Sequence, residues 1–317
     1  MGAPTAAALA GWTPVALSCA KGELAIDWAD LRGVRFAEPF LHQTIERWAA
    51  QNPAPLVRGG RDLLEALDGA PSLDPAAIIF HVSRCGSTLL SRLLGQIRGV
   101  LAMSEPAPVN SLLLAGDAAT PSALRLLVRA LGRRRFGDES HYVLKLSSWN
   151  VRRAALFRAA FPAARFIWLQ RAPEEVVASL LADPPGWFAL RRDRAAARAL
   201  FGDDADLSDD TSFCVGAVAS LFEAVEALRP DMVLDHADLP AAAWEKIAPS
   251  IGLAPNADDI LRMESAARFS AKDAEPRLFA AAREARPLPP GLREKVAENL
   301  APLYAALART GMAGGRD

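Results

Sequence analysis

The stretch AAIIFHVSRCGSTLLSRLLGQI, residues 76–97, decides the fold. Its first seven residues, AAIIFHV (76–82), form a short apolar run that predicts a strand buried on both faces. The polar turn SRCGST (83–88) follows, and the apolar residues after it are spaced as in a helix. A strand, a tight turn of small residues and a helix, in this order, begin a βαβ unit.

The same alternation continues to about residue 253. We expect four further strands, at GVLAMS (99–104), HYVLKL (141–146), ARFIWLQ (164–170) and MVLDHADL (232–239), and helices that include 121–134, 151–161, 173–182 and 213–228. Strands that alternate with helices predict an α/β domain with a central parallel sheet, whose ligands bind at the carboxyl ends of the strands. Residues 1–75 are expected to form a helical and irregular extension, and residues 76–317 the α/β domain with a helical C-terminal part.

The composition is that of an ordinary globular protein. Of 317 residues, 51% are hydrophobic and 23% are charged, and 36 Lys and Arg nearly balance 37 Asp and Glu. This balance gives no reason to expect a nucleic-acid or anionic membrane partner. The cysteines, Cys19, Cys85 and Cys214, are odd in number and widely spaced, which predicts a reducing compartment. The apolar start lacks the charged region of a signal peptide, and no apolar run approaches the roughly 20 residues of a membrane span. We therefore expect a cytoplasmic protein.

The turn after the first strand has the features of an anion site. Backbone N–H groups at the start of a helix point outward without partners, and the helix dipole adds positive potential. A glycine in the turn allows close backbone approach, two hydroxyls add donors and an arginine adds a fixed charge. A nucleotide-triphosphatase loop would carry lysine at position 87, where this chain has serine. The turn is therefore either a capped helix start or a phosphate cradle without that lysine, formed by Ser83, Arg84, Cys85, Gly86, Ser87 and Thr88.

Three more segments carry candidate residues at strand ends. Arg171 follows the strand 164–170, and Ser179 lies eight residues later inside the next helix. Glu105 follows the strand 99–104, 21 residues after Arg84, and Lys145 lies near the end of the strand 141–146. A solvated arginine, an ordinary helical serine, a capping glutamate and a surface lysine are the alternative interpretations of these four residues.

Together these segments resemble sulfotransferases with a P-loop NTPase-like fold, most closely bacterial members and tyrosylprotein sulfotransferases. The resemblance covers roughly residues 76–255, and its most specific parts are the turn and the spacing from Arg171 to Ser179. It implies a three-layer fold and a 3′-phosphoadenosine 5′-phosphosulfate donor, whose 3′-phosphate would be bound by Arg171 and Ser179. It also implies that Glu105 is the general base, that Lys145 and Arg84 stabilise charge, and that no metal is required. The acceptor would be a small molecule or peptide with a hydroxyl or amine.

The chain also departs from the pattern. The common cytosolic sulfotransferases have Lys-Ser-Gly-Thr-Thr-Trp in the loop, whereas this chain has Arg-Cys-Gly-Ser-Thr-Leu, without the tryptophan. Their glycine- and lysine-rich C-terminal segment is replaced here only by SAARFSAKD (265–273), with Arg268 and Lys272 as candidate cations. Two other functions stay open: a P-loop kinase or NTPase with a degenerate loop, and a nucleotide-binding protein without catalytic activity.

Overall fold

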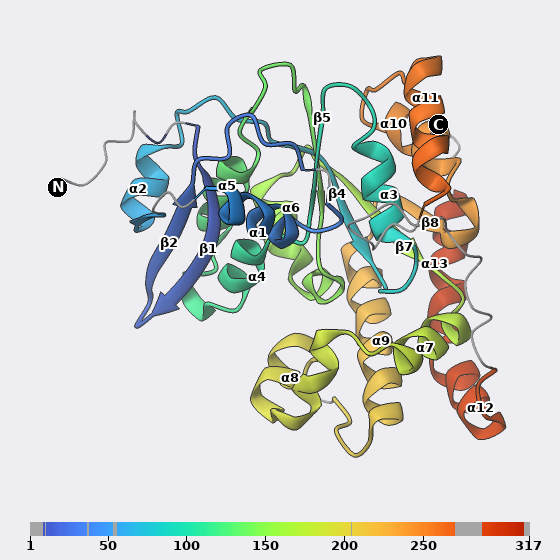
Figure 1. Ribbon diagram of the computed structural model, residues 1–317. Coiled ribbons are helices and arrows are strands. Elements are labelled where there is room, and N and C mark those ends of the chain that lie inside the picture. The colour runs from blue at the N-terminus through green and yellow to red at the C-terminus, as the bar shows by residue number, and fades with distance from the viewer. Residues whose placement is uncertain are drawn as a thin grey trace.

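The computed structural model describes residue 9 and residues 11–36, 38–52, 56–203, 205–269 and 287–313. Its centre is a five-stranded parallel sheet (Figure 1), formed by β4 (Pro75–His81), β5 (Val100–Ser104), β6 (His141–Lys145), β7 (Arg165–Gln170) and β8 (Met232–Asp235). The strand order is β5-β6-β4-β7-β8, so the first strand of this sheet lies in its middle. The predicted α/β class with a central parallel sheet and flanking helices is confirmed.

The middle strand is buried on both faces, as its apolar sequence predicts. Ile78, Ile79 and Phe80 are fully buried, and β6 and β7 pair with β4 on either side. Four strands agree with the predicted bounds within two residues, but β8 ends four residues early. The carboxylate of Asp235 accepts a hydrogen bond from the Ala237 N–H at 3.0 Å, and this bond starts a short 3₁₀ helix in place of more strand.

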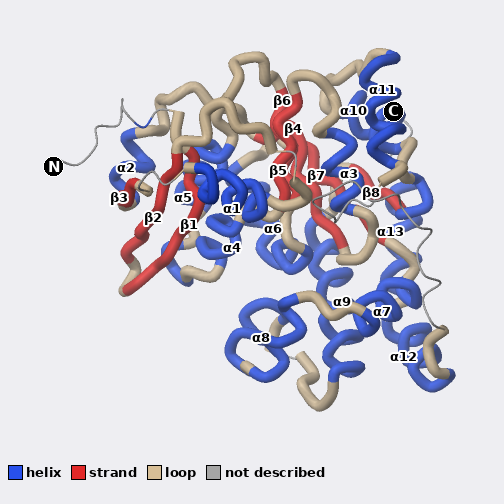
Figure 2. The backbone as a smooth tube through the Cα atoms, viewed as in Figure 1, coloured by secondary structure: helices blue, strands red, loops and turns tan. Residues whose placement is uncertain are grey.

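Helices flank the sheet (Figure 2). The helix α3 (Ser87–Leu94) follows β4 and packs against α11 (Ala257–Ala267). A second pair of packed helices consists of α5 (Pro121–Leu131) and α6 (Ala154–Ala160). The 3₁₀ helix η3 (Ser148–Arg153) directly follows β6. The other helices are α1 (Leu41–Gln51), α2 (Arg61–Ala66), α4 (Ala107–Leu113), α7 (Pro173–Ala182), α8 (Arg194–Phe201), α9 (Asp210–Leu228), α10 (Ala248–Ser250), α12 (Pro290–Asn299) and α13 (Ala301–Ala313).

The helix α9 is longer and more apolar than the sequence analysis allowed. It has 19 residues and is, within the described part of the chain, the one helix long and apolar enough to cross a membrane by length and composition alone. Ten of its residues are buried, and it packs against α7, α8, α13 and η3. Contacts on several sides explain the apolar sequence, because a core helix needs apolar residues around most of its surface.

The N-terminal region contains a small sheet that the sequence analysis missed. β1 (Thr13–Ala20), β2 (Glu23–Ala29) and β3 (Val57–Gly59) form a three-stranded antiparallel sheet, so the expectation of a helical and irregular extension is wrong here. Lys21 and Gly22, both with positive φ (53° and 82°), form the two-residue turn between β1 and β2. Such a turn between alternating apolar residues is a hairpin signal, and here it was hidden by the general apolar character of the N-terminus.

Candidate active site

The turn between β4 and α3 has an unusual backbone. Ser83, Arg84 and Gly86 have φ angles of 75°, 52° and 86°, a region that costs free energy for residues other than glycine. A Cβ atom on Gly86 would lie 2.8 Å from Nδ1 of His236, which donates a hydrogen bond to the Cys85 carbonyl. The N-terminus of α3 has no side-chain cap and no acidic residue in its first turn. The geometry is therefore that of an anion-binding nest at a helix start without a side-chain cap.

Arg84 leaves the turn towards the loop that follows α7. One of its Nη atoms donates to the carboxylate of Asp183 at 2.6 Å and also to the Asp183 carbonyl. Its Nε is buried and has no hydrogen-bond partner among the described residues. A buried guanidinium donor without a partner is costly, and the oxygen of a bound anion would satisfy it.

Arg171 also contacts this turn. Its Nη1 donates to the Arg84 carbonyl at 3.2 Å, and its Nε donates to a carboxylate oxygen of Glu175 at 2.6 Å. Ser179 lies in the second turn of α7 and is partly buried, and no hydrogen bond of its hydroxyl occurs within the described residues. The fold therefore brings Arg171 to the turn, whereas it makes no direct contact between Arg171 and Ser179.

Glu105 and Lys145 meet at the ends of two neighbouring strands. In the register of β5 and β6, Ser104 lies beside Lys145, and the Glu105 N–H donates to the Lys145 carbonyl at 2.7 Å. Their side chains form an ion pair, in which the Lys145 side chain is 1% exposed and that of Glu105 is 27% exposed. The ring of Phe40, from the N-terminal region, lies 5.2 Å from Nζ of Lys145. The ion pair is thus nearly buried, with the carboxylate as its accessible part.

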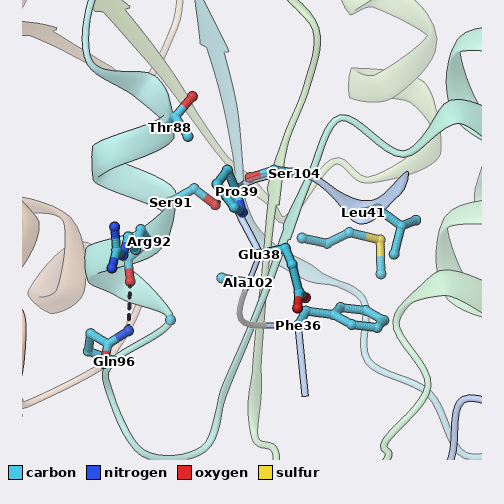
Figure 3. A pocket seen from close by; sticks show the side chains of 12 residues that line it. Phe36, Glu38, Pro39, Leu41, Thr88, Ser91, Arg92, Gln96, Ala102 and Ser104 are labelled. Atoms are coloured by element: carbon cyan, nitrogen blue, oxygen red, sulfur yellow. Dashed lines mark hydrogen bonds between the residues drawn. The ribbon is translucent and has the colours of Figure 1, made fainter. Parts of the chain in front are cut away.

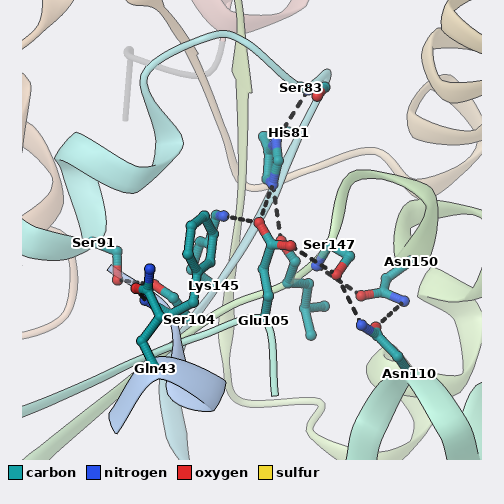
Figure 4. A network of polar contacts seen from close by, with 12 residues as sticks. Gln43, His81, Ser83, Ser91, Ser104, Glu105, Asn110, Lys145, Ser147 and Asn150 are labelled. Carbon is teal, nitrogen blue, oxygen red and sulfur yellow. Dashed lines mark hydrogen bonds and ion pairs between the residues drawn. The ribbon is translucent and has the colours of Figure 1, made fainter. Parts of the chain in front are cut away.

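Three polar residues not anticipated from the sequence hold this carboxylate (Figure 4). The hydroxyl of Ser147 donates to Oε2 of Glu105 at 3.1 Å, and Asn110 Nδ2 donates to that hydroxyl at 3.0 Å. Asn150 Nδ2 donates to Oδ1 of Asn110 at 3.1 Å, while Asn150 Oδ1 accepts from the Ser147 N–H at 2.8 Å. In this series of hydrogen bonds every side-chain donor points towards Glu105. The series therefore fixes the orientation of the Glu105 carboxylate and favours its negative charge.

The same contacts set the pKa of the ionisable groups. Burial alone would raise the pKa of Glu105, but the charge of Lys145 and the hydrogen bonds from Lys145 and Ser147 hold it below its ordinary value of 4.5. Burial, with the charge of Lys145, lowers the pKa of His81 to about 3. Its Nε2–H donates to the Leu146 carbonyl at 2.9 Å, and its Nδ1 accepts from the Ser83 N–H at 3.0 Å. His81 is therefore a neutral, fully bonded residue that supports the turn, and Glu105 is ionised.

A cavity of about 470 Å³ connects these groups. The turn contributes Ser83, Arg84, Ser87 and Thr88, and the strand ends contribute Glu105 and Lys145, together with Phe40, Trp149 and the segment from Asp183 to Trp187. Arg171 and Ser179 lie outside the lining of this cavity. Six of the predicted site residues thus share one cavity, and Cys85 is a buried small residue of the turn whose pKa burial raises to about 11.

A smaller cavity of about 200 Å³ lies along α3 (Figure 3). It lies between α3, β5 and the segment from Phe36 to Leu41, and it shares only Thr88 with the larger cavity. Two of its polar lining residues already have a protein partner, because the Ser104 hydroxyl donates a hydrogen bond to the Ser91 hydroxyl at 2.8 Å. Of the C-terminal candidates, Arg268 is exposed after α11, and Lys272 lies outside the described residues.

Comparisons with known proteins concern mainly the fold. No family model matches the chain, and no curated protein matches it. Among solved structures, the crystal structure of a sulfotransferase from Alicyclobacillus acidocaldarius is similar over 77% of this chain and 100% of its own, with 16% identity and a TM-score of 0.45. A likeness this distant carries no inference about activity, so the function has to be argued from the site.

Proposed function

We propose that this chain is a sulfotransferase that uses 3′-phosphoadenosine 5′-phosphosulfate. The observation that carries the proposal is the arrangement of four strand ends. The turn after β4 and the Glu105–Lys145 pair at the ends of β5 and β6 face one cavity, while Arg171 after β7 donates a hydrogen bond to the turn. An anion cradle beside a base and a cation is what transfer of a charged group requires.

The turn offers hydrogen-bond donors that the phosphates of the proposed donor could accept from. The start of α3 has no side-chain cap, and the Nε of Arg84 is a buried donor without an acceptor among the described residues. Arg171 is joined to the turn by a hydrogen bond to the Arg84 carbonyl. Its guanidinium could bind a second phosphate, which in this donor is the 3′-phosphate. The serine at position 87 removes the lysine that a nucleoside triphosphate would need, which disfavours the kinase or NTPase alternative.

The reaction that follows is an in-line displacement at sulfur. The acceptor oxygen or nitrogen forms a bond to sulfur, the bond from sulfur to the 5′-phosphate oxygen breaks, and its electron pair leaves with 3′-phosphoadenosine 5′-phosphate. Glu105 takes the acceptor proton, while Lys145 and Arg84 stabilise the charge on the transferred and departing oxygens. Glu105 is ionised at neutral pH and can therefore act as a base. If Lys145 turns to the donor, the pKa of Glu105 rises and the base becomes stronger.

Calorimetric titration with two nucleotides tests the donor assignment. We expect the protein to bind 3′-phosphoadenosine 5′-phosphate more tightly than adenosine 5′-phosphate, and Arg171→Ala to remove most of this preference because it loses the contact to the 3′-phosphate. Arg165→Ala, at the opposite end of β7, is the matched control and should keep the preference. Equal losses for both nucleotides would refute the role of Arg171, and a protein that binds neither would refute the donor.

A turnover assay separates catalysis from binding alone. Incubation with donor labelled in its sulfuryl group, with a phenol as acceptor or water as the default, should release 3′-phosphoadenosine 5′-phosphate. Glu105→Gln should bind the nucleotide product but lose at least about a hundredfold in turnover, the size of a general-base contribution. Near wild-type turnover would exclude Glu105 as the base. Binding without any turnover would favour the non-catalytic alternative, and magnesium-dependent ATP hydrolysis would favour the NTPase alternative.

A further inference from the structure

A second basic cavity, of about 260 Å³, lies next to the candidate active site. Arg152 and Arg153 from η3 line it, together with Arg198 from α8. Trp149, at the start of the same η3 helix, lines both this cavity and the cavity of Glu105 and Lys145. The two cavities therefore share a wall, and one short helix contributes to both.

The three arginines differ from the cations around the turn in having no partners. Arg84, Lys145 and Arg171 each form an ion pair with a carboxylate. Within the described part of the chain, no hydrogen bond or ion pair is formed by the guanidinium groups of the other three, which are Arg152, Arg153 and Arg198. The three arginines are exposed, and the carboxylates of Glu223 and Asp203 act on Arg152 from nearby without an ion pair to any of the three among the described residues. A bound anion would therefore be a direct partner for these guanidinium groups and would relieve their mutual repulsion.

The Arg152 guanidinium lies close to the backbone of Gly202. A Cβ atom on Gly202 would lie 2.8 Å from Nη2 of Arg152, so the guanidinium lies directly against the backbone at this glycine. Partial burial lowers the pKa of Arg152, the nearby carboxylates of Glu223 and Asp203 oppose this shift, and the charge of Arg153 adds to it. Asp203 also lines the cavity, but it forms no ion pair with the three arginines in the described structure. Gly202 thus permits this close approach, and a larger residue would require the Arg152 guanidinium to shift.

Aromatic packing fixes α8 relative to the active site. Trp187, which lines the cavity of Glu105, lies 4.9 Å from the ring of Phe201 at the end of α8, and both pack on Phe213 of α9. Figure 1 shows α8 next to α9 below the sheet. The position of Arg198 is therefore tied to the wall of the active site and not to a free surface loop.

We infer that Arg152, Arg153 and Arg198 bind an anionic group of the acceptor. This inference rests on the proposed function and names its substrate class: a hydroxyl or amine compound that carries a phosphate, sulfate or carboxylate group at a distance from the reacting atom. In a 3₁₀ helix each residue advances about 2.0 Å, so Arg153 lies on the order of 8 Å along η3 from Trp149.

Binding of radiolabelled inorganic phosphate tests the anion site without any assumption about the reaction. Equilibrium dialysis is done with Arg84→Ala protein, in which the turn has lost its cation. In this background, adding Arg152→Gln and Arg198→Gln should weaken the remaining phosphate binding by at least about tenfold, the effect of losing charged donors. The matched control is Arg194→Gln, an exposed arginine on α8 that does not line the cavity, and it should leave binding unchanged. Equal binding by all three proteins, or an equal loss in the control, overturns the anion site.

Acceptor preference tests the link to catalysis. Two acceptors are compared in the otherwise wild-type protein: 3-(4-hydroxyphenyl)propionate and its methyl ester, which lacks the charge. We expect the wild type to prefer the carboxylate in kcat/KM, and Arg152→Gln with Arg198→Gln to reduce that preference about tenfold without changing turnover of the ester. Transfer with an unchanged preference refutes the acceptor role. Loss of phosphate binding together with absence of any sulfuryl transfer refutes the proposed function but keeps the anion site.

Discussion

Replacing Lys145 by Met should destabilise the protein strongly and in a pH-dependent manner. Lys145 is 1% exposed and forms the main ion pair of Glu105, so its loss leaves a carboxylate with only one strong donor. Breaking a buried ion pair costs about 3 to 5 kcal/mol, and we expect about 3 kcal/mol because 27% of the Glu105 side chain is still exposed. The measurement is urea-induced unfolding of wild type and variant between pH 5 and 8.

The pH dependence follows from the pKa of Glu105. In the wild type this pKa lies below 4.5, so the stabilising contribution of Glu105 is present above pH 4.5 and is lost as the pH falls through the lowered folded value. Without Lys145, burial raises the folded pKa above the unfolded one. The penalty in Lys145→Met is then full above the raised pKa and disappears towards pH 4.5. The difference between the two proteins should therefore be largest at pH 8.

The double variant Glu105→Gln with Lys145→Met is the control. It carries no charge at either position of the pair, so its stability should lie closer to wild type than that of Lys145→Met, with a coupling energy on the order of 2 kcal/mol. A Lys145→Met protein within about 1 kcal/mol of wild type at pH 8, or with the same deficit at every pH, would refute the assignment of this pair as a buried, interdependent unit.

Three single substitutions test other contacts of the site. Asp183→Asn should tighten the binding of 3′-phosphoadenosine 5′-phosphate by up to about fivefold in calorimetry, because it removes the carboxylate that competes for Arg84 and leaves only the bond to the backbone carbonyl; weaker binding would contradict this. Ser147→Ala should lower turnover about tenfold with nucleotide binding unchanged, since its hydroxyl orients Glu105; a loss of binding instead would contradict that role. Gly86→Ala should lower stability by at least about 1 kcal/mol in thermal unfolding, since its φ is 86° and a histidine ring occupies the space; wild-type stability would show that the turn adapts.

The sequence predicts the central sheet well because its strands are buried on both faces. Runs such as AAIIFHV are apolar at every position except His81, as a strand buried on both faces requires. The rule that ligands bind at the carboxyl ends of parallel strands then predicts that residues after different strands meet. Glu105, Lys145 and Arg84 do line one cavity, although 61 positions separate Arg84 from Lys145.

The residues that support Glu105 and Lys145 could not be predicted from the sequence. Ser147, Asn110 and Asn150 acquire their function from the angle at which η3 leaves β6, and nothing in their local sequence marks them. Phe40 reaches Lys145 from a region that sequence analysis interpreted only as an extension. Arg198 lies in an Ala- and Arg-rich stretch in which every arginine has the same local context, and only the fold shows which one lines a cavity.

The carboxylates around the candidate active site suggest an order of events. Asp183 and Glu175, the partners of Arg84 and Arg171, are 78% and 51% exposed, so a phosphate can replace them at a cost of about 1 kcal/mol or less each. Glu105 is far less exposed, and its pair with Lys145 resists replacement more strongly. The proposed donor would therefore first occupy the two arginines and only then compete for Lys145. Because Glu105 becomes a stronger base only when Lys145 turns away, acceptor deprotonation would follow donor binding, which protects the site from unproductive proton transfer.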